Sequence, residues 1–280
     1  IIGLNGAGKS TLMNVLSGIY PYGSYEGNII YDGEICKFNT IKDSEHKGIV
    51  IIHQELALIP YMTIGENMYL GNERGRSFSI NWNETYGEAD KYLKIVGLEE
   101  SSRTLIKDIG VGKQQLVEIA KALAKNAKLL ILDEPLDGLD PVMRKQIWTI
   151  LMSEVAERRT TVLVSSHNLR ELEDVCDHVG IMHQGTIMIE RSLSDLQGSV
   201  SKIQVACQNG VPKLPEEFEV LHMSNTGRVY TLIVKGDPED AKKALAAANP
   251  AIVDVLPLTL EEIFIYEMGG ADYEVKDILF

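Results

Sequence analysis

Residues 3–11 read GLNGAGKST, which fits the phosphate-binding pattern GxxxxGK[ST]. In this pattern a glycine-rich loop turns its backbone N–H groups onto phosphate oxygens and leads into the N-terminus of a helix. The following residues, TLMNVLSGI, have helical periodicity, and Gly18 is a helix stop signal. A chance glycine-rich turn is the alternative interpretation, but it does not explain the helix that follows. The stretch therefore predicts a nucleotide-binding fold of the α/β class.

The side chains of this loop have distinct predicted roles in binding the cofactors ATP and Mg²⁺. Lys9 is expected to bridge the β- and γ-phosphates, and Ser10 to place its hydroxyl on Mg²⁺. The loop residues that we expect to contact the nucleotide are Gly3, Asn5, Gly6, Ala7, Gly8, Lys9, Ser10 and Thr11.

A second motif lies at residues 129–134, where the apolar run LLILD ends in two adjacent carboxylates, Asp133 and Glu134. In a chain with a phosphate loop this pattern indicates a Walker B strand. Asp133 is then expected to hold Mg²⁺ through its water shell, and Glu134 to orient and polarise the attacking water. A bound cation makes the two neighbouring carboxylates tolerable, because like charges this close otherwise repel. Taken alone, the pattern also fits a buried strand with a solvated acidic end.

Alternating strand and helix patterns surround the two motifs. Apolar strands are expected at 48–52, 129–133 and 160–166, and a helix at about 141–158 between the last two implies a parallel sheet. The remaining predicted elements are a hairpin at 29–38 around Asp32 and Gly33, a helical region at about 84–125 with a stop at Gly97, a helix at 168–179 and a hairpin at 181–189.

The composition excludes several classes of protein. The chain has 280 residues, of which 45% are hydrophobic and 24% charged, and a formal net charge of −13. No apolar stretch approaches a membrane span and the first residues lack the features of a signal peptide, so any membrane association is expected through a partner. The acidic charge argues against nucleic acid as a partner. Cys36, Cys176 and Cys207 are isolated, which predicts reduced core thiols in a cytosolic protein.

The motifs together resemble the ATP-binding cassette (ABC) family. Gln54, after the apolar strand GIVIIH, resembles the Q-loop glutamine, which senses Mg²⁺ and the attacking water and couples to the transmembrane subunit. Asp140 in DGLD is similar to the D-loop, and His167 in SSH resembles the switch histidine that contacts the γ-phosphate. The resemblance implies catalytic roles for Glu134, His167 and Gln54, a nucleotide contact for Asp140, and metal binding by Ser10, Gln54 and Asp133.

The segment IGVGKQQLVEIAKAL, residues 109–123, stands where the family has its LSGGQ signature. Glycine replaces the serine and lysine replaces one glycine. Gly110 and Gly112 still offer unhindered N–H groups at a helix N-terminus, so they and Gln114 are expected to face the γ-phosphate held by an opposite cassette. Lys113 adds a positive charge at the same end, either for bound phosphate or as a solvent-facing side chain.

The predicted architecture is an α/β P-loop NTPase of the ABC cassette type, with a mostly parallel sheet, a helical subdomain and a small α+β C-terminal domain. We expect the nucleotide-binding domain at 1–197, its helical subdomain at about 55–125, and an accessory domain at 198–280. A regulatory or dimer-supporting role and a purely structural role are both open for this last domain.

The two halves of the chain resemble different branches of the family. Residues 1 to about 134, with IIHQELALIPYMTIGENMYLGNE, resemble ATPases that drive monosaccharide import, whereas residues from about 136 onward, ending in LTLEEIFIYEM, resemble ABC-2 type export ATPases. We hypothesise a junction of two cassette sequences, either a natural recombinant or an assembly error. The chain also begins directly before the phosphate loop, so we expect a truncated cassette without the adenine-stacking aromatic, with weaker ATP binding and an unpaired sheet edge.

The resemblance implies an ATP-hydrolysing subunit that powers substrate movement across a membrane. Two cassettes are expected to pair head to tail, as a homo- or heterodimer, on the cytoplasmic face of the cell membrane beneath a transmembrane permease. The apolar segment ALIPYMTIGENMYLG, residues 57–71, follows Gln54 where the permease is received, although ordinary helical core also explains it. A non-transport ABC ATPase and a non-functional chimera are the other possibilities.

Overall fold

The structure is a computed structural model that describes residues 1–76, 79–134, 139–206, 214, 218–246 and 250–263. It divides into two compact units, one made of residue 1 and residues 3–167, the other of residue 2 and residues 168 onward. The domain boundary predicted near residue 197 lies inside the second unit and stays a prediction. Cys207 and the end of the predicted tail element LTLEEIFIYEM, from residue 264, lie outside the described residues.

The first unit is built on a three-stranded parallel sheet. Its strands are β3 (Ile49–Ile52), β6 (Leu129–Asp133) and β7 (Thr161–Ser165), in the order β3-β6-β7. All three runs were expected from their continuous apolar sequences, which are typical of strands buried on both faces. The parallel pairing confirms the predicted sheet, and its register places Asp133 opposite Ser165. The carboxyl ends of three strands therefore meet at one edge.

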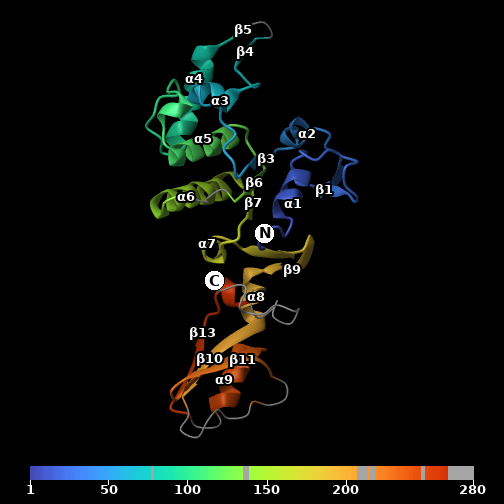
Figure 1. The fold of residues 1–280 in the computed structure, drawn as a ribbon, viewed down its shortest axis with the longest axis vertical. Helices are drawn as coiled ribbons and strands as arrows, with labels where there is room; N and C mark the ends of the chain where they lie inside the picture. Colours follow the sequence, from blue (N-terminus) through green and yellow to red (C-terminus); the bar gives the residue numbers. More distant parts are fainter. Residues whose placement is uncertain (77–78, 135–138, 207–213, 215–217, 247–249, 264–280) are drawn as a thin grey trace. The chain divides into compact units, whose positions relative to one another are not determined.

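Helices cover both faces of this sheet. Figure 1 shows α1 (Lys9–Leu16) on one side of β6, and α5 (Val111–Leu123) and α6 (Pro141–Arg158) on the other. On the α1 side, Met13 packs with Ile49 and Ile131 in a buried apolar cluster. The predicted helix at 141–158 is confirmed, and α1 follows the glycine loop as predicted. Packing on both faces holds the strand ends in fixed positions.

A hairpin and a short helix flank α1. Strands β1 (Ile29–Tyr31) and β2 (Glu34–Cys36) pair antiparallel around Asp32 and Gly33, whose φ angles are +53° and +77°. Two successive positive φ angles are those of the tight hairpin turn that the Asp-Gly pair predicts. Helix α2 (Ile41–His46) then leads into β3.

The helical subdomain contains α3 (Ile64–Tyr69), α4 (Trp82–Ile95) and the 3-10 turn η1 (Ile106–Asp108) before α5. Helix α4 ends just before Gly97, whose φ of +71° confirms the predicted stop. The prediction of a largely helical region missed a small hairpin, β4 (Gly75–Arg76) with β5 (Ser79–Ile80). Strands of two residues leave no periodicity in a sequence, which explains the miss.

The second unit begins with α7 (Leu169–Glu173), which is shorter than the helix predicted at 168–179. The prediction was wrong at its C-terminal end, because strand β8 (His178–His183) begins there and pairs with β9 (Thr186–Ser192). The apolar residues Val179 and Ile181 are buried in this hairpin, so extended backbone replaces the helix.

The rest of the second unit is the expected α+β module. Helix α8 (Leu193–Ser199) precedes an antiparallel sheet of β10 (Val200–Ala206), β11 (Glu219–Thr226), β12 (Val229–Lys235) and β13 (Ile252–Leu256), in the order β11-β12-β10-β13. Helix α9 (Pro238–Ala246) buries Ala241 and Leu245 against the β10 and β12 residues Ile203, Val205, Leu232 and Val234. Among the described residues, no helix combines the length and apolar character that crossing a membrane requires.

Candidate functional site

Residues 3–8 form a loop whose shape depends on glycine. Gly6 and Gly8 adopt φ angles of +81° and +99°, in the left-handed region that other residues rarely enter. Gly8 is the N-cap of α1, so the loop leads directly into the helix N-terminus as the pattern predicted. No side chain caps this end, which leaves the first N–H groups of α1 available to an anion.

The side chain of Lys9 folds back over this loop and is only 4% exposed. Its ammonium donates to the carbonyl oxygens of Gly3, at 2.7 Å, and Leu4, at 3.3 Å. It also lies 3.1 Å from Oε1 of Glu134. The loop thus holds a buried cation whose only carboxylate contact among the described residues is Glu134.

Glu134 follows β6 and is the meeting point of three other predicted site residues. Besides Lys9, its carboxylate contacts Nδ1 of His167 at 3.4 Å and Nε2 of Gln54 at 3.4 Å, both through Oε2. Gln54 follows β3 and His167 follows β7, so the parallel sheet itself brings these groups together. The backbone of Glu134 has φ +46°, an uncommon conformation for this residue type. Strain of this kind is typical of functional sites.

A cavity of about 460 Å³ opens over these groups. It is lined by Asn5, Gly6, Gly8, Lys9, Ser10, Thr11, Gln54, Glu134 and His167. All nine were predicted as site residues from the sequence. Gly3, Ala7 and Asp133 do not line it, although Gly3 contributes the carbonyl that holds Lys9.

Asp133 does not line the cavity and is 5% exposed. Its Oδ1 accepts a hydrogen bond of 2.6 Å from the hydroxyl of Ser165, the last residue of β7. The sequence analysis did not single out Ser165. Its signal was a polar residue at the buried end of an apolar strand, where a hydroxyl needs a hydrogen-bond partner.

The signature segment lies at the start of α5 and outside the cavity lining. Gly110 is the N-cap of α5, and Gln114 donates from Nε2 to the carbonyl oxygens of Ile106, at 3.2 Å, and Ile109, at 3.0 Å. Lys113 forms an ion pair with Glu100 and is half exposed. Contacts within the chain therefore hold the segment in place, and its contact with an opposite cassette stays a prediction.

Asp140 is the N-cap of α6. Its Oδ1 accepts from the backbone N–H groups of Val142, at 3.0 Å, and Met143, at 3.1 Å. Residues 135–138, which include the start of the D-loop motif, lie outside the described residues. Helix capping accounts for Asp140 in this chain, and its role toward a nucleotide stays a prediction.

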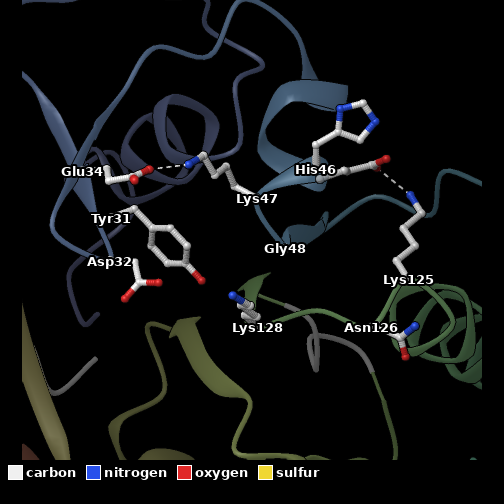
Figure 2. Close-up of a pocket in the computed structure, with 10 residues that line it drawn as sticks. Tyr31, Asp32, Glu34, His46, Lys47, Gly48, Lys125, Asn126 and Lys128 are labelled. Atoms are coloured by element: carbon white, nitrogen blue, oxygen red, sulfur yellow. Dashed lines mark hydrogen bonds and ion pairs between the residues drawn. The ribbon is translucent and has the colours of Figure 1, made fainter.

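A second cavity, of about 430 Å³, lies at the opposite end of the sheet (Figure 2). Gly48 and Lys128, which precede β3 and β6, belong to its lining. Four of its other charged side chains form two pairs, Lys47 with Glu34 at 2.6 Å and Lys125 with Glu45 at 2.6 Å, and Asp32 also belongs to the lining. Within each pair the two charges neutralise each other. In the first cavity, by contrast, Lys9, Gln54 and His167 share the one carboxylate of Glu134.

The fold and the first cavity define a class of protein. The site has the parts of a P-loop nucleotide-binding cassette, a class that hydrolyses ATP. These parts are a glycine loop before a helix, a buried lysine over that loop, and carboxylates at the end of the neighbouring parallel strand. Residues 1–137 match the family model described as "ABC transporter". The fold and the site of this part of the chain are therefore those of an ATP-binding cassette, and its sequence is similar to the ABC transporter family.

Curated relatives and solved structures agree with this assignment. The chain is 56% identical over 185 residues to the L-arabinose transport ATP-binding protein AraG of Geobacillus stearothermophilus, covering 66% of this chain and 36% of that protein. It is 49% identical over 185 residues to the xylose import ATP-binding protein XylG of Moorella thermoacetica, with 66% of this chain and 36% of that protein covered. The chain thus spans little more than a third of the length of these relatives.

Among solved structures, the dimeric ATP-binding cassette MJ0796 bound to ADP and Pi superimposes with a TM-score of 0.59 and 26% identity. The match covers 69% of this chain and 83% of that one. The ADP conformation of the cassette MJ1267 gives the same TM-score with 27% identity, over 69% of this chain and 79% of that one.

Proposed function

We propose that this chain binds and hydrolyses ATP as the energy-supplying subunit of an ABC transporter for a monosaccharide. The observation that carries the proposal is the convergence of Lys9, Gln54 and His167 on the Glu134 carboxylate beside the glycine loop. Three basic or amide groups around one carboxylate form a site that can exchange this internal anion for a phosphate.

Each group has a role that follows from its position. The loop N–H groups and Lys9 bind the phosphates, and a phosphate that enters the cavity competes with Glu134 for the Lys9 ammonium. Released from Lys9, the carboxylate of Glu134 can accept a proton from an attacking water. Gln54 and His167, which already contact this carboxylate, orient the water and the terminal phosphate.

The residues present also fit Mg²⁺, a cation that prefers oxygen ligands and keeps several waters. Ser10 offers its hydroxyl in the cavity lining, and Asp133 has one oxygen engaged by Ser165. Ser10 would contact the ion directly and Asp133 through water, as predicted, while Gln54 stands at the cavity wall. When bound, the cation neutralises phosphate charge and adds to the attraction that Lys9 supplies.

A second cassette is part of the proposal. The signature segment Gly110–Gln114 stands at the N-terminus of α5 and does not line the cavity of its own chain, as a head-to-tail dimer requires. The relative MJ0796 is described as dimeric, which supports this arrangement.

The proposed permease contact is the apolar segment 57–71 that follows Gln54. Part of it is core, because Ile64, Met68 and Tyr69 are buried. Ile59, Tyr61 and Leu70 are 42%, 78% and 52% exposed, so core packing explains only part of the segment. Exposed apolar side chains within one short segment favour a partner surface. Through such a partner, the chain would act at the cytoplasmic face of the membrane.

The direction of transport is proposed from the relatives, whose names include L-arabinose transport and xylose import. An export ATPase is the second candidate, and it rests on the resemblance of residues 136–280 alone. The hypothesis of a junction between two cassette sequences has the same basis. A single long sequencing read across the codons for residues 120–150 tests it, and an interrupted frame there would establish an artefact.

Catalysis is tested by Glu134→Gln in the full chain. Replacement of the carboxylate by an amide removes the proton acceptor, so ATP turnover is expected to fall by about 100-fold or more. Nucleotide affinity is expected to stay the same or rise, because the amide no longer holds Lys9 as an ion pair. Phosphate release and calorimetric titration with ADP measure the two quantities. Turnover at the wild-type rate would show that Glu134 is not the proton acceptor.

The transport role is tested by the partner. Co-expression with the permease genes of the same locus is expected to recover a polytopic membrane protein with the wild-type chain, and less of it with Tyr61→Asp. Thr149→Asp, at an exposed position of α6, is the matched control because it also adds a single negative charge. Co-sedimentation with ribosomes in place of a permease would contradict the transport function.

A further inference from the structure

Ser165 is the one buried hydroxyl that touches both halves of the Asp133-Glu134 pair among the described residues. It ends β7, is 0% exposed, and lies opposite Asp133 in the parallel register. Its Oγ donates to Oδ1 of Asp133 at 2.6 Å and accepts from the backbone N–H of Glu134 at 3.1 Å. A single side chain thus joins a carboxylate and the backbone of the next residue.

The contact with Asp133 fixes the direction of that carboxylate. A buried carboxylate without a donor is costly, and a hydrogen bond to a charged group is among the stronger ones in a protein. Because Oδ1 already accepts this bond, Oδ2 keeps the greater capacity for a ligand outside the strand pair. The hydroxyl therefore orients the Asp133 carboxylate.

The contact with Glu134 supports an unfavourable backbone conformation. The Glu134 N–H is also 3.2 Å from the carbonyl oxygen of Ser165, so this one residue holds the N–H with two acceptors. The φ of +46° at Glu134 directs its side chain toward Lys9, Gln54 and His167. A conformation of this kind persists only where the surroundings over-determine it.

We propose that Ser165 is a positioning residue that sets both carboxylates, Asp133 through its hydroxyl proton and Glu134 through its oxygen lone pairs. This inference rests on the proposed ATPase function and deepens it. On this proposal, Ser165 at the end of β7 orients two carboxylates at the same time: Asp133, which is proposed to act on the metal, and Glu134, which is proposed to act on the water. The group does not touch the nucleotide cavity, whose lining excludes it.

The test uses the full chain with Ser165→Ala, Ser165→Thr and the control Thr161→Ala. Thr161 is an exposed residue at the other end of the same strand. For Ser165→Ala we expect kcat for ATP to fall about 10- to 100-fold, as for the loss of a hydrogen bond to a charged group, with ADP affinity without Mg²⁺ unchanged within about threefold. Ser165→Thr, which keeps the hydroxyl, is expected to recover most of kcat, and Thr161→Ala to match the wild type.

Two outcomes overturn the proposal: wild-type turnover in Ser165→Ala, or equal impairment of the alanine and threonine variants. If Ser165→Ala does not fold, Ser165→Cys, which has a somewhat larger thiol that is only a weak donor, carries the same expectation. If the wild type itself hydrolyses no ATP, the proposed function fails, and the role of Ser165 is tested instead by the effect of Mg²⁺ on ADP affinity. The gain in ADP affinity on adding Mg²⁺ must then be smaller in Ser165→Ala than in the wild type, and an equal gain rejects the inference.

Discussion

At the carboxyl end of the parallel sheet, three side chains share the Glu134 carboxylate, whereas at the amino end Glu34 and Glu45 each meet one lysine. Both ends carry lysines, carboxylates and a cavity of similar size, about 460 Å³ and 430 Å³. The difference is in how the charges are distributed. Paired charges at an exposed surface contribute little and attract no further ion, whereas a buried lysine that shares its carboxylate can accept a phosphate instead.

The backbone shows a weaker contrast. Left-handed residues occur at both ends: the amino end has Gly48, Asp32 and Asn126, residue types that tolerate positive φ, and also Arg159, which precedes β7. At the carboxyl end Glu134 adopts φ +46° with a long side chain, which costs of order 1 kcal/mol or more. Positive φ at a long side chain is therefore not confined to one end, but at Glu134 it accompanies a carboxylate that three other side chains contact.

The sharpest test of this contrast is the same substitution at both ends, Lys9→Met and Lys125→Met. Lys9 is a buried cation beside the proposed phosphate site, so its loss is expected to weaken ADP binding about 30-fold or more. Lys125, in the other cavity, is expected to leave ADP binding unchanged. Calorimetric titration of the full chain measures both. Equal losses of affinity would mean that the two ends do not differ in function.

A smaller effect is expected from Gly48→Ala at the amino end. Gly48 has φ +84°, and an added Cβ would lie 3.1 Å from Cγ of Lys128. We expect the free energy of unfolding to fall by about 1–2 kcal/mol, because alanine rarely adopts this conformation. Urea unfolding measures it, with ADP affinity unchanged.

The matched control is Gly87→Ala in α4, where the added Cβ meets no atom within 4 Å and φ is not positive. This variant is expected to be more stable by about 0.5–1 kcal/mol, because glycine is unfavourable inside a helix. A loss of stability in both variants would remove the conformational explanation for Gly48.

Most of the sheet and the cavity could be predicted from the sequence, for a physical reason. The run 129–133 is apolar throughout and ends in two carboxylates, and residues 3–11 combine three glycines with a lysine at fixed spacing. Such local patterns determine both the elements and the chemistry at their ends. Seven of the nine residues that line the cavity follow from these patterns, whereas Gln54 and His167 were expected from the family resemblance.

The parts that could not be predicted depend on contacts between distant residues. Ser165 acquires its role from the register that sets it opposite Asp133, and no local pattern contains that register. The end of α7 has the same origin, because pairing with β9 extends the chain from His178 even though the preceding residues have helical periodicity. Tertiary pairing overrides local preference at such places.

The smallest effect is expected for the amino-end pair Lys125–Glu45, and it completes the comparison. Both side chains are partly buried, 25% and 21% exposed, so the pair is expected to contribute about 0.5–1 kcal/mol to the free energy of unfolding. A double-mutant cycle with Lys125→Met and Glu45→Gln isolates this coupling, which should decrease at high salt because the charges remain accessible to ions. A coupling of several kcal/mol that salt does not reduce would show a charge pair as buried as Lys9 with Glu134. The amino end would then no longer differ from the nucleotide site in how it holds its charges.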